Sequence, residues 1–500
     1  MKLPTAGVCH LSTSWRLAWP DQVSLSADDG RLGIAGPRSR LALREPRSEI
    51  LAALRRLSPP GEHEERLADA VLTAGGAESL ARWFYCINQL NERGLIRRSL
   101  WVGEKPLATI APQGEPLATD RKRHSNRPGA AYVLSRFTYL HRDGSEMVIE
   151  SPLAHARIIL HDPLAAAVVV ALAAPATIEE LGRYACEMPV DAVAALVDAL
   201  AENCLVDQLS DEPSDNVASV LETWEFHDLL FHSRSRRGRY DAPFGGTYRL
   251  AHRPPPPAVK DATCGPGVPA ASAIQLDRPD IERLMRDDPP LAYVQERRKS
   301  LRSYGETPMK LAQLGEFLFR VARVKDRYSA DVPTPSGTVT FDLTSRPYPA
   351  GGGLYEMEFY LAIRRCEGLS PGLYHYEGVA HALTQVAASP RHVEALVDEA
   401  AASAGIEPKT VQTLVILAAR FERLAWKYES IAYALALKHV GVLYQTMYLA
   451  ATAMGLAPCA LGCGDSDLFA RASNLDYYSE ASVGEFLLGS VATPASLPGR

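Results

Sequence analysis

The spacing of apolar residues changes along the chain, and each change predicts a different element. In the first half, apolar residues three or four positions apart, typical of helices, lead into apolar pairs suited to strands. Ile87–Arg98 contains a Leu-Ile pair near its end, and Val197–Gln208 contains a Leu-Val pair at the matching place. Because the two stretches align, we predict two copies of one structural unit.

Both copies have the same kind of surroundings. An earlier helical stretch precedes each one, at Arg47–Leu57 and Pro163–Ala173, and strand-like alternation lies upstream in Val23–Ala35 and Tyr132–Leu160. Strands, helices and a final strand follow the order of a winged-helix module. We therefore predict two winged-helix-like modules in tandem.

The break after each predicted helix needs a residue with a left-handed backbone. Gly94 is the expected residue in the first copy. The aligned residue in the second copy is Cys204, so we expect the neighbouring Asn203 to take that conformation there.

Winged-helix modules most often bind DNA through a basic helix, but the second copy is acidic, and DNA phosphates would repel it. Its acidic residues are Asp191, Asp198, Glu202, Asp207, Asp211 and Glu212. This composition disfavours nucleic-acid binding and favours a peptide-binding or purely structural role.

Thr223–Lys260 has a different character. It contains the aromatic residues Trp224, Phe226 and Phe231, the basic run 233–239 and the proline run Pro254–Pro257, which must be extended. Two interpretations stay open: a solvated interdomain linker, or an arm whose aromatic residues dock on a surface, such as that of a second subunit.

The second half of the chain alternates helices and strands and predicts an α+β domain. Glu296–Tyr304 and Lys310–Ala322 are predicted helices, Met357–Arg364 alternates with period two like a strand, and Val411–Phe421 is an apolar, strand-like run. Ile431–Met454 is a long helix that is apolar almost all round, which is typical of a core or a subunit interface.

Composition adds exclusions. The 500 residues suggest about three domains, and a net charge of −6 does not favour nucleic acid as a partner. The cysteines are scattered without zinc-site spacing, which predicts reduced thiols and no metal site; they are Cys9, Cys86, Cys186, Cys204, Cys264, Cys366, Cys459 and Cys463. With no signal peptide and no apolar run long enough for a membrane span, we expect a cytoplasmic protein.

Four motifs in the second half could carry chemistry. Arg297–Arg302, which includes Arg298, Lys299, Ser300 and Arg302, places cations and a hydroxyl at a predicted helix start, where a phosphate could bind. Such basic helix starts are usually only solvated. The second motif, Ser345–Tyr355, joins Pro349 to Gly351, Gly352 and Gly353 in a loop that could approach a flat ligand closely or simply turn before a strand.

The other two motifs flank the long helix. Lys427 and Tyr428 precede it, and a buried lysine there could act as a base, although without further context the pattern favours an ordinary amphipathic lysine at a helix start. Gly455–Gly464 follows it, with Leu461, Gly462 and Gly464 in a stretch whose backbone amides could hydrogen-bond a heterocycle or merely connect a helix to a strand.

Together, in this order and spacing, the four motifs resemble those of the SagB-type dehydrogenases, nitroreductase-fold flavoproteins that mature ribosomal peptides with azole rings. The 437–469 region is most similar to the cyanobactin-oxidase (ThcOx) branch. The resemblance covers residues 286–490 strongly. It extends more loosely to the N-terminal half, which resembles the peptide-clamp (RiPP recognition element) modules of that branch.

The resemblance implies FMN bound at a homodimer interface. Arg298, Ser300 and Arg302, with Lys299 between them, would hold the phosphate and the ring edge. Pro349 and the three glycines would line one side of the flavin ring. The amides near Leu461, Gly462 and Gly464 would lie at its reactive end, and Lys427 would be the general base with Tyr428 orienting it or the substrate.

Two departures from the family pattern affect this transfer. Glu356 stands where proline is common after the tyrosine of the glycine loop, and 489–498 lacks a basic residue for the phosphate, so that only Arg500 follows. The resemblance then places more of the phosphate binding on Arg298 and Arg302.

The resulting hypothesis has two peptide-clamp modules at 1–128 and 129–220, a linker or docking arm at 221–285 and an FMN dehydrogenase domain at 286–500. The expected function is FMN-dependent oxidation of thiazolines or oxazolines in a precursor peptide, by a homodimer that binds no nucleic acid and no membrane, with a cyclodehydratase of the same pathway as a candidate partner. A flavin oxidase of small molecules and a flavin-free partner of a cyclodehydratase complex are the alternatives.

Overall fold

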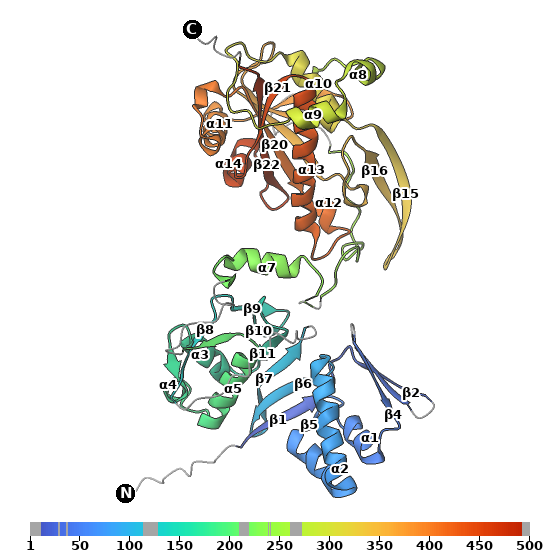
Figure 1. The fold of residues 1–500 in the computed structure, drawn as a ribbon, viewed down its shortest axis with the longest axis vertical. Helices are drawn as coiled ribbons and strands as arrows, with labels where there is room; N and C mark the ends of the chain where they lie inside the picture. The colour runs from blue at the N-terminus through green and yellow to red at the C-terminus, as the bar shows by residue number, and fades with distance from the viewer. Residues whose placement is uncertain are drawn as a thin grey trace. The chain divides into compact units, whose positions relative to one another are not determined.

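The computed structural model describes residues 12–28, 31–36, 39–113, 129–209, 220–238, 240, 242–260 and 273–492. By its internal contacts the chain divides into an N-terminal unit, Met1–Ala242, and a C-terminal unit, Pro243–Arg500 (Figure 1). Cys9, Asp211, Glu212, Arg239, Cys264 and Arg500, which the sequence analysis named, lie outside the described part.

The centre of the N-terminal unit is an antiparallel seven-stranded sheet with the order β5-β1-β6-β7-β11-β10-β9. Its strands are β1 Thr13–Ala18, β5 Glu62–His63, β6 Arg97–Val102, β7 Lys105–Pro112, β9 Tyr139–Asp143, β10 Glu146–Glu150 and β11 Ala156–Leu160. Because β7 pairs with β11, strands from before residue 113 and strands from after residue 129 form one sheet.

Smaller sheets and helices surround this sheet. The first part of the unit adds β2 Ser24–Asp28, β3 Arg31–Ala35, β4 Arg40–Arg44, α1 Ser48–Arg55 and α2 Glu64–Glu92. The second part adds β8 Ala131–Leu134, α3 Pro163–Ala171, β12 Ala176–Thr177, α4 Ile178–Tyr184, α5 Val190–Glu202 and β13 Val206–Gln208. Each of the two predicted copies therefore does end in a helix followed by a strand: α2 and β6 in the first copy, and α5 and β13 in the second.

The left-handed residue after the second helix is not the predicted one. Gly94 has φ 63°, as expected, but Cys204 has φ 55° whereas Asn203 has φ −105°. The prediction for Asn203 was therefore wrong. Gly94 and Cys204 occupy the same aligned position after their helices, and this position determines which residue is left-handed. The higher intrinsic tolerance of asparagine for this conformation does not determine it.

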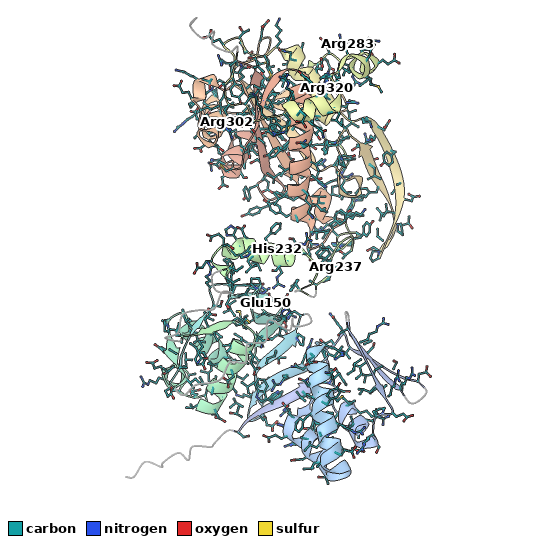
Figure 2. The ribbon with its side chains drawn as sticks, viewed as in Figure 1. Glu150, His232, Arg237, Arg283, Arg302 and Arg320 are labelled. Carbon is teal, nitrogen blue, oxygen red and sulfur yellow. The ribbon has the colours of Figure 1, made fainter. Side chains whose placement is uncertain are left out.

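Helix α7, Phe226–Arg234, packs on the sheet of the N-terminal unit. Phe226 stands edge-on to Tyr139 at 6.0 Å between ring centroids. Arg234 Nη2 bonds the Glu150 carboxylate at 2.6 Å, and Glu150, labelled in Figure 2, is only 2% exposed. A buried carboxylate needs such a charged partner, so this ion pair fixes the end of α7.

The C-terminal unit is built on a second seven-stranded sheet, also antiparallel, with the order β14-β19-β18-β17-β20-β22-β21. Its strands are β14 Ile274–Gln275, β17 Met357–Ile363, β18 Gly372–Glu377, β19 Ala382–Val386, β20 Thr413–Arg420, β21 Leu456–Ala460 and β22 Glu480–Ser490. A separate hairpin consists of β15 Asp326–Thr334 and β16 Gly337–Ser345.

Helices cover both faces of this sheet, which explains why its central strands are apolar on both sides. Phe359 and Leu361 of β17 belong to the core under α10 and α13, and Tyr360 and Ala362 belong to the core under α11 and α14. Figure 1 shows α13 on one side of the sheet and α11 with α14 on the other. The helices are α8 Ile281–Asp287, α9 Leu291–Arg297, α10 Leu311–Ala322, α11 Pro390–Ala404, α12 Phe421–Ala425, α13 Ala432–Ala453 and α14 Ser466–Ser473, with short 3-10 turns η3 Gly351–Gly353 and η4 Pro408–Thr410.

The prediction of a helix at 296–304 was wrong, because the helix lies earlier in the chain. Helix α9 ends at Arg297 and the chain is irregular from Arg298 to the start of α10. Arg298 to Arg302 therefore follow a helix C-terminus, where the helix dipole favours cations, and no helix N-terminus adds to phosphate binding there.

Across the described ranges, no helix combines the length and the apolar character that a membrane crossing requires.

Candidate functional site

Helix α13 connects all the predicted motifs. Its buried side contains His439, Val440, Leu443, Met447 and Tyr448, which recur every three or four residues on one helical face. The N-terminal half of this face meets the glycine loop, and the C-terminal half meets β21 and the segment after α9. The helix thus forms a common support for residues that are far apart in the sequence.

The glycine loop lies directly against Lys427 and Tyr428. A Cβ atom added to Gly352 would lie 2.7 Å from Tyr428 Oη and 2.8 Å from Lys427 Nζ. Gly352 and Gly353 also have φ of 64° and 69°, which side chains rarely allow. Glycine is therefore required here both by conformation and by the approach of the lysine amine.

A buried chain of hydrogen bonds connects this loop to His439 of α13 and to Glu356. The Gly351 amide donates to His439 Nε2 at 2.8 Å, and His439 Nδ1 lies 2.7 Å from Glu356 Oε1. Because Nε2 accepts, the proton must be on Nδ1, which donates to the carboxyl group. Glu356, the departure from the family's proline, therefore has a specific role in orienting His439.

Arg423 joins three segments around the same loop. Its guanidinium group is fully buried and donates to the carbonyl oxygens of Leu354, Pro256 and Asp342. Burial, with the nearby charges of Arg420 and Arg346, lowers the pKa of Arg423 to about 10. The end of the glycine loop, the β16 strand and the 243–260 segment are thereby fixed to α12.

A second cluster surrounds the basic motif after α9. Ser300 Oγ lies 2.7 Å from Tyr448 Oη, and the Tyr448 hydroxyl also accepts a hydrogen bond from the Ala460 amide at 2.8 Å. The Arg298 guanidinium lies 5.3 Å from the centre of the Tyr448 ring. Within the described residues, Arg298, Lys299 and Arg302 have no carboxylate partner, so these cations are available for an anionic ligand.

The end of β21 completes this second cluster. The Leu461 amide already donates to the Glu485 carbonyl at 2.9 Å, as part of the sheet. Gly462 is exposed with open space around its Cα, so its amide, rather than that of Leu461, can meet a ligand. The Glu485 carboxylate fills the place where a side chain at Gly464 would lie, and burial raises the pKa of Glu485.

The structure brings the predicted residues together in two groups rather than one. Lys427, Tyr428 and Gly351–Gly353 form the first group, and Arg298–Arg302, Leu461 and Gly462 form the second. Pro349 is exposed next to the first. His439 supports the first group and Tyr448 the second, and two and a half helical turns separate them, about 14 Å along the axis.

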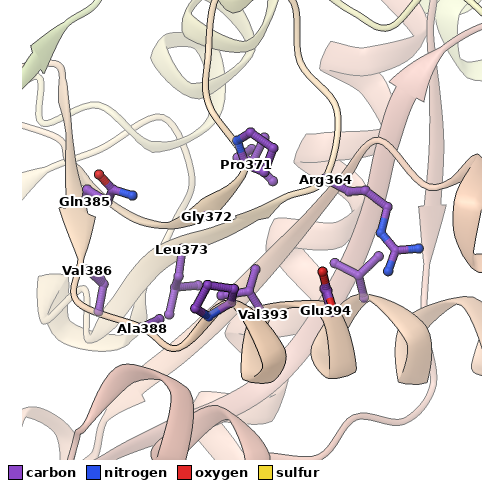
Figure 3. Close-up of a pocket in the computed structure, with 12 residues that line it drawn as sticks. Arg364, Pro371, Gly372, Leu373, Gln385, Val386, Ala388, Val393 and Glu394 are labelled. Atoms are coloured by element: carbon purple, nitrogen blue, oxygen red, sulfur yellow. The ribbon is translucent and has the colours of Figure 1, made fainter.

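A separate cavity of about 270 Å³ lies between α11 and the β18–β19 hairpin, with Leu373, Val386 and Val393 in its wall (Figure 3). It also contacts Ile363, at the end of β17 opposite Met357. Since a strand advances about 3.3 Å per residue, this end of β17 lies roughly 20 Å from Met357, where the chain enters the strand after the glycine loop. The cavity is not part of either cluster.

Three family models match the chain one after another. Residues 11–119 match the ThcOx helix-turn-helix domain, residues 132–241 match Cyanobactin oxidase ThcOx, and residues 296–490 match the Nitroreductase family. The chain belongs to the cyanobactin oxidase family. It is an oxidoreductase that oxidises azolines in ribosomal peptide maturation, on a nitroreductase-like domain.

Individual relatives of this oxidase match smaller parts of it. A protein described as nitroreductase MJ1384 from Methanocaldococcus jannaschii is 26% identical over 192 residues, which is 38% of this chain and 84% of the relative. A nitroreductase structure from Ralstonia eutropha is 21% identical, covers 48% of this chain and 100% of its own, and has a TM-score of 0.34. The E. coli microcin synthetase McbBCD complex with truncated pro-MccB17 is 20% identical, covering 56% and 94%, with a TM-score of 0.32.

These findings confirm the predicted family, the oxidoreductase class and the α+β fold with a helix-turn-helix-type domain before a nitroreductase domain. The sequence interpretation missed His439 and Arg423. The available signal was a polar residue inside an otherwise apolar stretch, since buried histidine and arginine side chains need specific partners.

Proposed function

We propose that this oxidase converts thiazoline or oxazoline rings of a precursor peptide to thiazoles or oxazoles with FMN as cofactor and Lys427 as the general base. The observation that supports this most is the position of the Lys427 amine. It is half-buried against Gly352 and, within the described part of the chain, forms no ion pair or hydrogen bond.

The donor groups of the second cluster fit FMN. Arg298, Lys299 and Arg302 are cations without an internal carboxylate, as phosphate binding requires. Ser300 adds a hydroxyl, and the exposed Gly462 amide adds a donor for a polar atom of the flavin ring. Gly351, Gly352 and Gly353 supply a surface without side chains, on which a flat ring can lie.

The reaction removes a proton from the former Cα of the azoline and a hydride from the adjacent ring carbon. When bound, FMN supplies the acceptor for the hydride. Lys427 in its neutral form takes the proton on Nζ. Tyr428 Oη, next to the same point of the loop, orients the amine or the substrate.

We further propose that two chains form the complete site. The two clusters lie about 14 Å apart along α13, so one chain presents the base at one end and the cations at the other. The outer side of α13 carries Leu437, Gly441 and Gln445 at four-residue spacing, all exposed. A second copy packed along this side in the opposite direction would bring its glycine loop towards the cations of the first.

The N-terminal unit is proposed to hold the peptide through its helix-turn-helix-type domain and the second winged-helix-like module, whose tandem arrangement remains a prediction. The domain boundaries 1–128, 129–220, 221–285 and 286–500 are likewise proposals, as is a cyclodehydratase partner.

The direct test is mass spectrometry of a heterocyclised peptide incubated with the purified protein, which should show the loss of two hydrogens per ring. Small-molecule substrates are the second candidate, and turnover of these without any change in the peptide would favour it. FMN should be released on denaturation, and a colourless protein that cannot be reconstituted with FMN would contradict the proposal.

Lys427→Ala should reduce azole formation at least about a hundredfold while leaving the bound flavin and its spectrum unchanged, because the amine takes the proton but does not hold the cofactor. Lys409→Ala removes a lysine that is 81% exposed on η4 and serves as the matched control. Full turnover by Lys427→Ala would show that the catalytic assignment is wrong.

A further inference from the structure

Pro243–Lys260, which the sequence left as a linker or an arm, lies against the residues on both sides of Lys427. We call this segment the strap. Gly245 and Glu429 exchange two backbone hydrogen bonds, of 3.1 and 2.9 Å, and the Tyr248 amide donates to the Lys427 carbonyl at 3.0 Å. Thr247 Oγ1 also donates to the Glu429 carboxylate at 2.8 Å. The backbone around Lys427 is therefore paired to the strap like the edge of a small sheet.

The proline run of the strap is anchored to α12. Proline has no N–H group, so a proline run offers carbonyl oxygens as its backbone hydrogen-bonding groups. Three donors from the 420–426 region take carbonyls of the strap: Trp426 Nε1 bonds Arg253, Arg423 Nη1 bonds Pro256 and Arg420 Nη2 bonds Pro257. At the far end, Lys260 Nζ bonds Glu480 and Tyr360. The strap is thus attached along its whole length.

Tyr248 places an aromatic ring of the strap beside the proposed base. Its ring packs edge-on against Trp426 at 5.8 Å, and Lys427 Nζ lies 5.7 Å from its centre. The Tyr428 ring lies 5.3 Å from the same amine. Two aromatic rings therefore flank the Lys427 side chain, one from the strap and one from its own neighbour.

The backbone of Tyr248 is held in an unfavourable conformation. Its φ of 54° lies in the left-handed region, which is disfavoured for residues with a Cβ atom and persists only where surrounding contacts impose it. Ser430 and Tyr355, at φ 65° and 46°, lie nearby in the chain segments on either side of the lysine and the glycine loop. This concentration of left-handed residues indicates that the geometry around Lys427 is imposed by tertiary contacts.

We propose that Tyr248 is a positioning residue for Lys427 and that the strap is a structural part of the active site. The strap fixes the Lys427 backbone, and the Tyr248 ring restricts the amine to the side that faces Gly352. The inference rests on the proposed role of Lys427 as the base.

Tyr248→Gly is the informative variant, because glycine accepts the left-handed backbone and the substitution removes only the ring. With the heterocyclised peptide, kcat should fall about ten- to a hundredfold, while KM and the flavin content stay near the values of the unmodified protein. Tyr248→Phe keeps the ring and should retain most of the turnover. Tyr478→Ala, which removes a tyrosine that is 84% exposed, is the control.

A second measurement does not depend on turnover. Acetylation of Lys427 by acetic anhydride, measured by peptide mass spectrometry relative to the exposed Lys409, should become severalfold faster in Tyr248→Gly because one side of the amine is uncovered. Tyr248→Phe should leave the rate unchanged.

The outcomes separate the two proposals. If Lys427→Ala abolishes turnover but Tyr248→Gly changes neither kcat nor the labelling rate, the positioning role is wrong and the proposed function stands. Equal losses in Tyr248→Gly and Tyr248→Phe would also overturn the positioning role of the ring. If Lys427→Ala keeps full turnover, the assignment of Lys427 as the general base fails, whereas faster labelling in Tyr248→Gly would still show that the ring covers the amine.

Discussion

Single residues around the glycine loop act mainly through hydrogen bonds to backbone groups. His439 accepts the Gly351 amide, and Arg423 binds three carbonyl oxygens from three segments. Such contacts specify position more than they add stability, because a hydrogen bond contributes only about 1 kcal/mol net, or roughly 2 kcal/mol when one partner is charged. Removing one partner is nevertheless costly, since the group left behind stays buried.

His439→Leu tests this view of the loop. The change leaves the Gly351 amide and the fully buried Glu356 carboxyl group without their partner, so the free energy of unfolding should fall by about 3 kcal/mol. Flavin retention should fall with it, because the loop loses its support. Urea denaturation and the ratio of bound FMN to protein measure the two effects.

The double variant His439→Leu/Glu356→Leu is the internal control. It removes the orphaned carboxyl group as well, so it should be more stable than His439→Leu alone. A double variant less stable than the single one would show that Glu356 has another partner that matters more than His439.

Between elements, buried charges tie the central strands of the C-terminal sheet together. Glu358 of β17 bonds His375 of β18 at 3.0 Å and lies 3.4 Å from Arg420 at the end of β20. Burial alone would raise the pKa of Glu358, but the His375 hydrogen bond and the charges of His375, Arg346 and Arg420 lower it to about 2. The folded state therefore binds this proton more weakly than the unfolded state does.

The pH dependence follows from this difference. A carboxyl group whose pKa is lower in the folded state stabilises the fold above its unfolded pKa, near 4.5, and this stabilisation is lost as the pH falls towards 2. Its full size is about 3 kcal/mol. Glu358→Gln should therefore be clearly less stable than the unmodified protein at pH 7, and the difference should shrink between about pH 5 and pH 2.

Hydrogen-exchange mass spectrometry of β17 and β18 peptides, corrected for intrinsic exchange at each pH, measures the stability difference between Glu358→Gln and the unmodified protein. A stability difference that stays constant down to pH 2 would show that Glu358 does not titrate as proposed.

On the scale of the whole molecule, the two clusters at opposite ends of α13 support a two-chain site. Leu437→Glu places a charge on the outer side of α13, where Leu437 is 39% exposed in the single chain. The fold should persist, but the dimer and the bound FMN should be lost together, because burying an unpaired charge in an interface is unfavourable.

Light scattering after size exclusion measures the mass, and absorbance measures the flavin. Val379→Glu, at an apolar surface position that is 47% exposed away from α13, is the matched control. A dimer that persists in Leu437→Glu with unchanged FMN would exclude this side of the helix as the interface.

The sequence by itself determined the elements whose signal is local. The helical spacing over 310–322 and 431–454 and the apolar runs of β17 and β20 correspond to the observed elements within a few residues. The order of the four motifs was sufficient for the family. The helix predicted at 296–304 failed because the helix begins earlier, at Leu291 after two prolines, and a basic run carries no signal for which end of a helix it occupies.

Tertiary structure alone decided which polar groups meet. Arg423 and Pro256 are 167 residues apart, and His439 and Gly351 are 88 apart. Such pairs form only when the chain closes its core, and buried donors then take whichever acceptors the packing places within reach. The same closure, and no local preference, holds Tyr248 and Cys204 in left-handed conformations and divides the predicted flavin site into two groups along one helix.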